Sequence, residues 1–220
     1  KILKKYNEPS WNNPVVRIVN GDGDNLVPRV ASDYSAKGLY HAMIKALTNY
    51  GNKIPEYVRL LGAELSATDL KTKETYYSMY CFWTGEKQLG SIEGVLNTEA
   101  GFMNGREVVK VTYNPAIVQD QSLTSFAKQH RMQPIARDDT YYHAKKDEDY
   151  YLQQTTYKYI PLSNLQRTKI NTALGERKDA EKYLSPSQRD WLRQMRGSNK
   201  RKDILFNKPF EASWNLLTSK

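Results

Sequence analysis

The spacing of apolar residues predicts two helices in the first third of the chain. Residues 36–50 carry an apolar side chain every three or four positions, as expected for a helix with one buried face. The side chains at this spacing are Leu39, Met43, Ile44 and Leu47. Ser35 is a suitable N-cap for the helix, and Gly51 is a suitable stop. Pro55 is expected to open a second helix, because proline fits the first helical position.

Runs of β-branched residues predict strands before these helices. Residues 14–19 (P-V-V-R-I-V) are expected to pair with a return strand at 26–30 (L-V-P-R-V). The intervening turn, 20–25, contains Asn-Gly and Asp-Gly, and both pairs favour a positive φ.

Strand and helix patterns alternate in the middle of the chain. A polar run at 66–73 marks a boundary, and a strand at 75–80 is then expected to lead into Cys81. A helix follows, from Cys81 to about Ile92. Residues 94–102 and 106–113 are expected to be two strands joined by the turn M-N-G.

The remaining sequence is mainly helical in pattern. Residues 119–130 predict an amphipathic helix, whereas 133–153 are polar and rich in tyrosine without a clear period. A short strand is expected at 157–162. Two sequences of capping-box form then predict helix starts, S-N-L-Q at 163–166 and S-P-S-Q at 185–188.

Together these elements predict an α+β fold. The first capped helix is expected to stop at Gly175, which marks the end of the central domain. The expected divisions are an N-terminal α/β element over 1–68, a central domain over 69–175 and a basic helical extension over 176–220.

The composition allows a folded core but no membrane-spanning segment. Hydrophobic residues make up 39% of the chain, and tyrosine, whose ring can be buried while its hydroxyl stays wet, occurs 16 times. No stretch approaches the roughly 20 apolar residues that a membrane span needs, and no signal peptide is visible. We therefore expect a soluble protein in a compartment that the sequence does not define. The chain starts at Lys1 rather than at methionine, which is consistent with loss of an upstream segment.

Positive charge is concentrated near the C-terminus. The net charge of the whole chain is +9, and residues 164–202 hold 11 Lys and Arg against 4 Asp and Glu, a net of +7. A polyanion contact through 189–202 is one interpretation, and a solvated helical face is the other. No nucleic-acid-binding motif accompanies the charge, so the sequence favours the second.

Cys81 is the only cysteine of the 220 residues. A cysteine at the start of a helix faces unpaired N–H groups and the positive end of the helix dipole, and both stabilise the reactive thiolate. Phe82 and Trp83 would lie beside the sulfur and form an apolar pair, called here the aromatic cup. The alternative is an inert, buried cysteine at the end of a core strand.

Three pieces of sequence around Cys81 resemble the A-type peptide methionine sulfoxide reductases. They are C-F-W (81–83), E-G-V-L-N-T-E-A-G-F (93–102) and E-V-V-K-V-T-Y-N-P (107–115). The family motifs are G-C-F-W, P-G-V-x-x-T-x-x-G-Y and E-x-V-x-V-x-[YF]-[DN]-P, in the same order, with a longer loop between the last two. The clear resemblance covers about a quarter of the chain, and a looser one continues to about residue 175. It implies a two-layer α+β sandwich for the central domain.

The resemblance also implies roles for individual residues. Cys81 would attack the sulfur of a methionine sulfoxide, Phe82 and Trp83 would hold the methyl group, and Glu107 would donate a proton to the departing oxygen. An apolar pocket favours the protonated form of a carboxyl group, as this acid role requires. Taken without the resemblance, Glu107 is a solvent-facing strand carboxylate. Glu86 is expected to be a dipole partner or a surface residue rather than a catalyst.

Several positions depart from the family pattern. Tyr80 replaces the glycine before the cysteine, and Phe102 replaces the tyrosine of Gly-Tyr. The long loop with a tyrosine for the sulfoxide oxygen is missing. A later motif, D-x-G-[TS]-Q-Y-R-S, would make Tyr157 the substrate-binding tyrosine, with Asp147 and Asp149 only near the aspartate position. No second cysteine is present to form a disulfide with the first.

A second, partial resemblance concerns residues 13–50. A proline followed by a strand, a turn, a return strand and a helix resembles the last part of a thioredoxin fold, although the upstream C-x-x-C is not in this chain. The alternatives are a remnant of such a domain and an accessory element on the central domain.

The sequence is therefore compatible with three functions. The first is a thiol-dependent oxidoreductase that reduces methionine sulfoxide, free or peptide-bound, or a related sulfoxide. It would need no bound cofactor or metal, only an external thiol reductant such as a thioredoxin or a small dithiol. The second is a redox sensor or thiol-exchange protein with the same fold, in which Cys81 is oxidised without sulfoxide turnover. The third is a polyanion-binding module. The sequence favours the first.

Overall fold

The computed structural model describes residues 2–9, 11, 14–69, 71–198 and 202–218. The chain divides into two compact units, Lys1–Ser66 and Ala67–Lys220. The central domain and the expected extension over 176–220 therefore lie within the same unit. Across the described residues, no helix combines the length and the apolar character that crossing a membrane would require.

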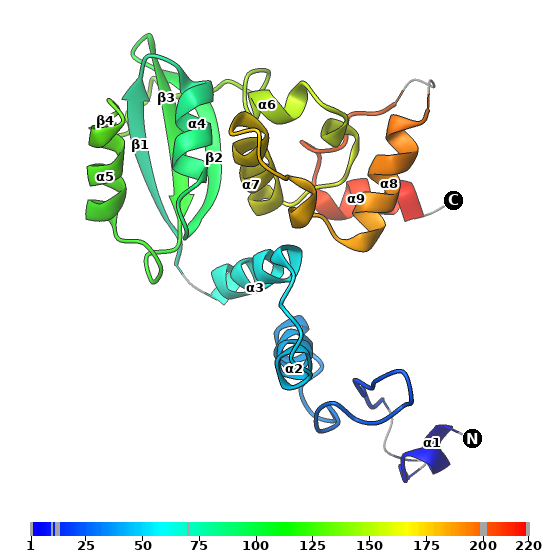
Figure 1. Cartoon of the computed structure of the whole chain (residues 1–220). Helices are drawn as coiled ribbons and strands as arrows, with labels where there is room; N and C mark the ends of the chain where they lie inside the picture. Colours follow the sequence, from blue (N-terminus) through cyan, green and yellow to red (C-terminus); the bar gives the residue numbers. More distant parts are fainter. Residues whose placement is uncertain (1, 10, 12–13, 70, 199–201, 219–220) are drawn as a thin grey trace. The chain divides into compact units, whose positions relative to one another are not determined.

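The first unit is built around helices. It contains α1 (Ile2–Lys5), α2 (Ala36–Asn49) and most of α3 (Glu56–Asp69) (Figure 1). The Ser35 hydroxyl caps α2 by accepting a hydrogen bond from the Gly38 N–H at 3.0 Å. Both helices predicted here are confirmed.

The two strands predicted before α2 are wrong. Residues 14–30 make only two isolated antiparallel bridges, Val16 with Val30 and Val19 with Asn25. Pro28 has no N–H to donate in the return segment, which limits the ladder to single bridges. The thioredoxin-like interpretation stays a prediction, and its first residue, 13, lies outside the described residues.

The second unit contains an antiparallel five-stranded sheet in the order β4-β1-β3-β2-β5. Its strands are β1 (Lys73–Met79), β2 (Val95–Met103), β3 (Arg106–Tyr113), β4 (Gln133–Ile135) and β5 (Tyr142–His143). Asn104 and Gly105, both at positive φ, turn β2 into β3. One sheet with flanking helices confirms the α+β fold class and the three central strands. The short strands β4 and β5 lie in the tyrosine-rich segment for which no structure was predicted.

Two helices cover the same face of this sheet, α4 (Phe82–Gly90) and α5 (Asp120–Gln129). Tyr77 points to this face, where its hydroxyl lies 3.3 Å from that of Thr124 on α5. Gly85 lets α4 approach closely, because a Cβ there would lie 1.9 Å from the Met79 sulfur. The buried core between sheet and helices includes Tyr77, Phe82, Leu89, Val109, Val111, Leu123 and Ala127.

A second, helical core lies beyond α4 in the same unit (Figure 1). It is formed by residues of α6 (Tyr150–Gln153), α7 (Asn164–Gly175), α8 (Pro186–Arg196), two 3₁₀ turns, Thr156–Tyr159 and Glu181–Tyr183, and the segments between them. The last helix, α9 (Phe210–Thr218), packs beside it through Trp214, which contacts Trp191 of α8 edge-on. Both predicted capping boxes form, at Ser163 and Ser185, and α7 ends at Gly175 as expected.

The strand predicted at 157–162 is wrong. The Thr155 hydroxyl accepts a hydrogen bond from the Tyr157 N–H at 3.3 Å and starts the first 3₁₀ turn there. The two cores are joined through α7, whose Thr172 hydroxyl donates to the Lys87 carbonyl of α4 at 3.1 Å. Lys169 donates to the Gly90 and Ile92 carbonyls at the end of α4. The position of α4 is therefore fixed from both sides.

Candidate functional site

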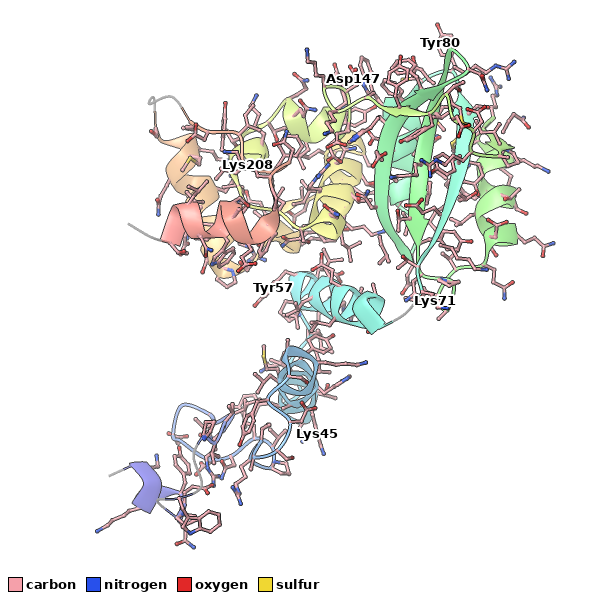
Figure 2. The ribbon with its side chains drawn as sticks, turned by 180° about the vertical axis from the view of Figure 1, so that it is seen from behind. Lys45, Tyr57, Lys71, Tyr80, Asp147 and Lys208 are labelled. Carbon is pink, nitrogen blue, oxygen red and sulfur yellow. The ribbon has the colours of Figure 1, made fainter. Side chains whose placement is uncertain are left out.

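Cys81 lies where β1 ends and α4 begins. It is the N-cap residue of α4, with an extended backbone, and the Gly85 N–H donates to its carbonyl at 3.1 Å to close the first turn. Its side chain is half-buried. The neighbouring Tyr80 is 98% exposed and lies at the end of the sheet opposite Lys71 (Figure 2). Cys81 thus lies at the positive end of a helix, the position that the sequence predicted for it.

Glu107 of β3 lies next to this helix start. It is the direct cross-strand partner of Met79, two residues before Cys81. Its Oε2 accepts a hydrogen bond from the Phe82 N–H, the first of α4, at 2.7 Å. Its Oε1 makes no hydrogen bond to any other described residue. The structure therefore brings Glu107 and Cys81 together, and one carboxyl oxygen is left for a ligand.

The aromatic cup continues into a larger aromatic row. Phe82 is buried and packs edge-on against Trp83, at 6.0 Å between ring centroids, and against Phe102, at 5.4 Å. Tyr142 of β5 stacks on Phe102 at 5.3 Å and is itself exposed. Glu107, Phe102 and Tyr142 are consecutive cross-strand partners, so their side chains share one face of the sheet.

Trp83 is covered by a residue that the sequence did not single out. The Tyr150 ring stacks on the indole with 4.0 Å between centroids and 17° between planes. The Trp83 Nε1 is buried and has no hydrogen-bond partner among the described residues. Tyr150 therefore closes one side of the aromatic cup.

Tyr157 lies elsewhere, in the helical core. It packs there with residues such as Leu152 and Ile160. Burial, followed by the charge of Glu181, raises the pKa of Tyr157 to about 12, and the charge of Arg196 opposes the shift. The tyrosines that the structure places along the aromatic row are Tyr142 and Tyr150. Both come from the segment 133–153, where tyrosine content was a signal but no periodicity assigned the residues to elements.

Glu86 corrects another prediction, since it is neither a surface residue nor at the start of α4. Its side chain is 0% exposed, and its Oε2 accepts a hydrogen bond from the Asp149 N–H at 3.0 Å. Asp149 is also buried and accepts from Arg167 Nε at 2.8 Å. Arg167 also pairs with Glu148, and His143 completes the group.

The sequence pattern hid this buried cluster because its members come from α4, β5, α7 and the β5–α6 connection. Burial, followed by the charges of Asp149 and Glu148, raises the pKa of Glu86 well above its ordinary value. Burial also raises the pKa of Asp149, although Arg167 opposes the shift. Asp149 directly precedes Tyr150, so the Glu86 contact holds the segment that covers Trp83.

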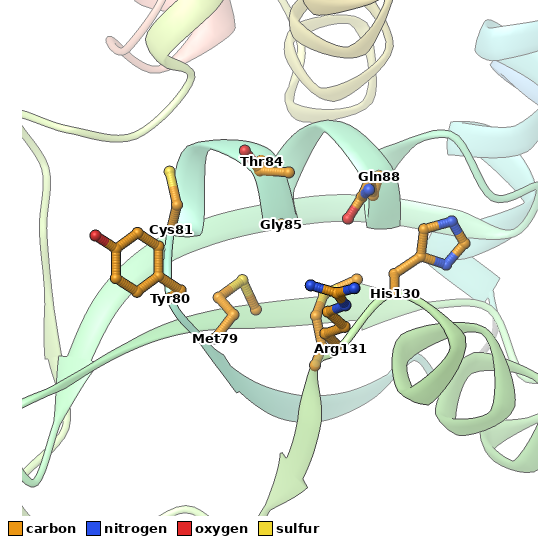
Figure 3. Close-up of a pocket in the computed structure, with 9 residues that line it drawn as sticks. Met79, Tyr80, Cys81, Thr84, Gly85, Gln88, His130 and Arg131 are labelled. Atoms are coloured by element: carbon orange, nitrogen blue, oxygen red, sulfur yellow. The ribbon is translucent and has the colours of Figure 1, made fainter.

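A cavity of about 220 Å³ lies on the other side of Cys81 (Figure 3). Figure 3 shows Cys81 and Tyr80 at one end, His130 at the other, and Met79 and Arg131 between them. The complete lining is Met79, Tyr80, Cys81, Thr84, Gly85, Gln88, His130, Arg131 and Met132. Phe82, Trp83 and Glu107 do not line this cavity. Cys81 therefore lies between the cavity on one side and these three residues on the other.

No metal centre is apparent in the part of the chain that the structure describes. No group of three or more His, Cys, Asp or Glu side chains there could hold a metal ion.

Part of the chain is similar to curated proteins. It is 37% identical over 65 residues to "Peptide methionine sulfoxide reductase MsrA" of Methanococcus maripaludis strain C5, a match covering 22% of this chain and 41% of that protein. The corresponding proteins of strains C6 and C7 are 34% and 32% identical over 77 residues, which cover 27% of this chain and 49% of each protein. No protein-family model matches the chain. The chain thus spans less than half the length of the curated relatives it matches, and it is distantly related to MsrA.

Proposed function

We propose that this chain is a thiol-dependent oxidoreductase that reduces methionine sulfoxide, free or peptide-bound, or a related sulfoxide. The observation that carries the proposal is the contact of Glu107 with the Phe82 N–H, because it places a carboxyl group beside Cys81. The distant relationship to MsrA supports the same reaction.

The chemistry follows from these groups. The Cys81 thiolate attacks the sulfoxide sulfur, and Glu107 donates a proton from Oε1 to the sulfoxide oxygen. The oxygen is transferred to Cys81, so a thioether and a protein sulfenic acid are formed. The substrate sulfur is reduced by two electrons, and Cys81 is oxidised by two. Protonation assists the step because an unprotonated oxygen leaves poorly.

The aromatic cup binds the methyl group next to the sulfoxide. Phe82 and Trp83 offer apolar ring surface, and Tyr150 holds the indole in place. The hydroxyl group of Tyr142, in place of that of Tyr157, contacts the bound sulfoxide. Tyr142 is suited to this role because it stacks on Phe102 on the face of the sheet that carries Glu107. Its hydroxyl makes no hydrogen bond within the described residues and is available to the sulfoxide oxygen.

Turnover needs a thiol from outside these 220 residues. Cys81 is the only cysteine of the 220 residues, so its sulfenic acid has no partner within this sequence. A thiol of a small molecule or of another protein forms a mixed disulfide with Cys81, and a second thiol releases it.

A redox sensor or thiol-exchange protein is the second candidate. The stack of Tyr150 on Trp83 favours it, because it covers ring surface that could otherwise contact a substrate. In that function peroxide oxidises Cys81 and thiols reduce it again, without any sulfoxide turnover.

One assay separates the two candidates. Purified protein is incubated with each epimer of methionine sulfoxide and dithiothreitol, and methionine is quantified. The reductase produces methionine from one epimer in an amount that exceeds the protein, and Cys81→Ser produces none. If wild type forms no methionine but is oxidised at Cys81 by peroxide, the sensor function is supported instead.

A further inference from the structure

Helix α4 presents two different faces that meet at Cys81. Trp83 and Glu86, three residues apart, face Tyr150 and the buried cluster. Cys81, Thr84, Gly85 and Gln88 follow the spacing of the opposite face and line the cavity of Figure 3. The cavity and the aromatic cup therefore lie on different faces of α4, and Cys81 adjoins both of them.

The lining of the cavity favours an anion. Arg131 forms no ion pair with any described residue, and its guanidinium group lies in the middle of the lining (Figure 3). His130 Nδ1 donates to the Phe126 carbonyl at 2.9 Å, so Nε2 is an acceptor in the neutral ring and a donor to an anion only in the protonated ring. The Gln88 amide adds two further donors. No carboxylate is among the lining residues.

We propose that this cavity binds a small thiol that carries a carboxylate, and that it presents the sulfur of this thiol to Cys81. The carboxylate pairs with Arg131, whose planar fork of donors suits a carboxylate. At about 220 Å³ the cavity is smaller than the roughly 300–1,000 Å³ typical of drug-sized ligands, so the occupant is small. The identification of the occupant as a reductant rests on the proposed reductase function.

In the cavity, the bound thiol reduces the Cys81 sulfenic acid in two steps. The bound thiolate attacks the sulfur of the Cys81 sulfenic acid, a sulfur–sulfur bond forms, and the hydroxyl group leaves with a proton as water. A second thiolate attacks the sulfur of the bound thiol, which releases Cys81 as a thiolate and the two small thiols as a disulfide. The two thiols lose two electrons, and Cys81 gains them.

The binding preference can be measured without any sulfoxide. Iodoacetate and iodoacetamide alkylate a thiolate at the same carbon but differ by a carboxylate. The alkylation rates of Cys81 with each reagent are compared in wild type and Arg131→Gln. Arg131 is exposed, and loss of one exposed ion pair corresponds to a change of up to about fivefold. We expect Arg131→Gln to slow iodoacetate about fivefold and to change the iodoacetamide rate by less than about twofold.

Two variants control for charge and for folding. Arg131→Lys keeps the charge and is expected to retain most of the iodoacetate rate. Arg137→Gln removes an exposed arginine that does not line the cavity, and it is expected to behave as wild type. If Arg131→Gln leaves the ratio of the two rates unchanged, or if Arg137→Gln lowers it equally, the proposed site is overturned.

A second measurement tests the role as a reductant. Sulfoxide turnover is followed with 3-mercaptopropionate and with neutral 2-mercaptoethanol. Arg131→Gln should raise the KM for the charged thiol about fivefold and leave that for the neutral thiol unchanged. If the variant instead raises the KM for free methionine sulfoxide alone, the cavity binds substrate and the proposal is wrong. If wild type turns over no sulfoxide with any thiol, the proposed function fails, and the alkylation rates still decide whether the cavity binds carboxylates.

Discussion

The Glu86 carboxyl group and the Asp149 N–H are joined by a buried hydrogen bond of 3.0 Å that connects α4 to the segment carrying Tyr150. Glu148 and Asp149 share Arg167, whereas Glu86 has no cation of its own. We infer that Glu86 is neutral in the folded protein, because it is buried and has no cation of its own. Burial of an unpaired charge costs far more than burial of a protonated acid.

The first prediction concerns Glu86 and stability. Its folded-state pKa lies above the ordinary value of 4.5, so above that pH the native state holds a proton that the unfolded chain has lost. Stability due to this group is therefore full below about pH 4.5 and falls as the pH rises towards the folded pKa. Glu86→Gln cannot ionise, so the variant does not lose this stability at high pH. The glutamine keeps an oxygen that accepts from the Asp149 N–H. Urea unfolding should show a gain of about 1 kcal/mol or more at pH 8 and little gain at pH 4.5.

Asp149→Asn provides the contrast, because it leaves Arg167 with one carboxylate fewer. We expect it to destabilise the protein by about 3 kcal/mol at pH 8, as for a buried pair that loses one partner. Equal effects of Glu86→Gln at the two pH values would show that Glu86 is ionised in the fold.

The second prediction concerns Glu107. Glu107→Gln keeps an oxygen for the Phe82 N–H but cannot donate an acidic proton, so sulfoxide turnover should fall by ~10²-fold or more. Alkylation of Cys81 by iodoacetamide should change little. Glu74→Gln, an exposed carboxylate on β1, is the matched control and should be fully active. Full activity of Glu107→Gln would mean that the carboxyl group only caps α4.

The third prediction concerns the aromatic cup. Trp83→Ala should lower kcat/KM for the sulfoxide by ~10- to 200-fold, the range for a methyl group in an apolar pocket. Tyr150→Ala should cause a smaller loss, because the indole remains but is no longer held. The iodoacetamide rate at Cys81 is measured beside turnover for both variants. Equal losses in the two measurements would show that Trp83 supports the fold around the thiol and does not bind substrate.

The fourth prediction concerns Tyr142. Tyr142→Phe keeps the stack on Phe102 and removes only the hydroxyl, so kcat should fall about tenfold while the fold is unchanged. Tyr157→Phe removes a hydroxyl from the helical core and should leave kcat unchanged, although it can lower stability. The opposite result, with kcat lost only in Tyr157→Phe, would support the residue that the sequence motif indicated.

The sequence predicted those parts of the site that depend on local pattern. The strand before Cys81, the helix after it and the hairpin that carries Glu107 follow from alternation, helical spacing and the Asn104-Gly105 turn. Tyr150, Tyr142 and the environment of Glu86 depend on contacts between residues more than 30 positions apart, and no periodic signal marks such contacts.

The prediction of two N-terminal strands was wrong for a related reason. β-branched residues favour extended backbone at 14–30, but a ladder also needs partners with free N–H groups, and these residues reach only single bridges. The starts of the two capped helices were predicted correctly because a capping box is formed by residues within a four-residue sequence. Ser163 and Gln166, for example, satisfy each other without help from the rest of the fold.

The last prediction concerns a single turnover without reductant. In the proposed reaction, attack by Cys81 leaves the substrate oxygen on its sulfur, and no second cysteine of this sequence can displace it. Reduced protein mixed with excess sulfoxide should therefore form one equivalent of methionine and stop. Intact mass should show one added oxygen, peptide mapping should place it at Cys81, and dithiothreitol should restart the reaction.

The control for this experiment is the sulfone, which has the same aromatic-cup contacts but should transfer no oxygen to a thiolate. Protein incubated with the sulfone should keep its original mass. Methionine formed beyond one equivalent without any added thiol would contradict the sulfenic acid route. A sensor function would be indicated if the sulfoxide left Cys81 unmodified while peroxide added one oxygen to it, because the thiol would then be reactive but the cup would not position a sulfoxide for attack.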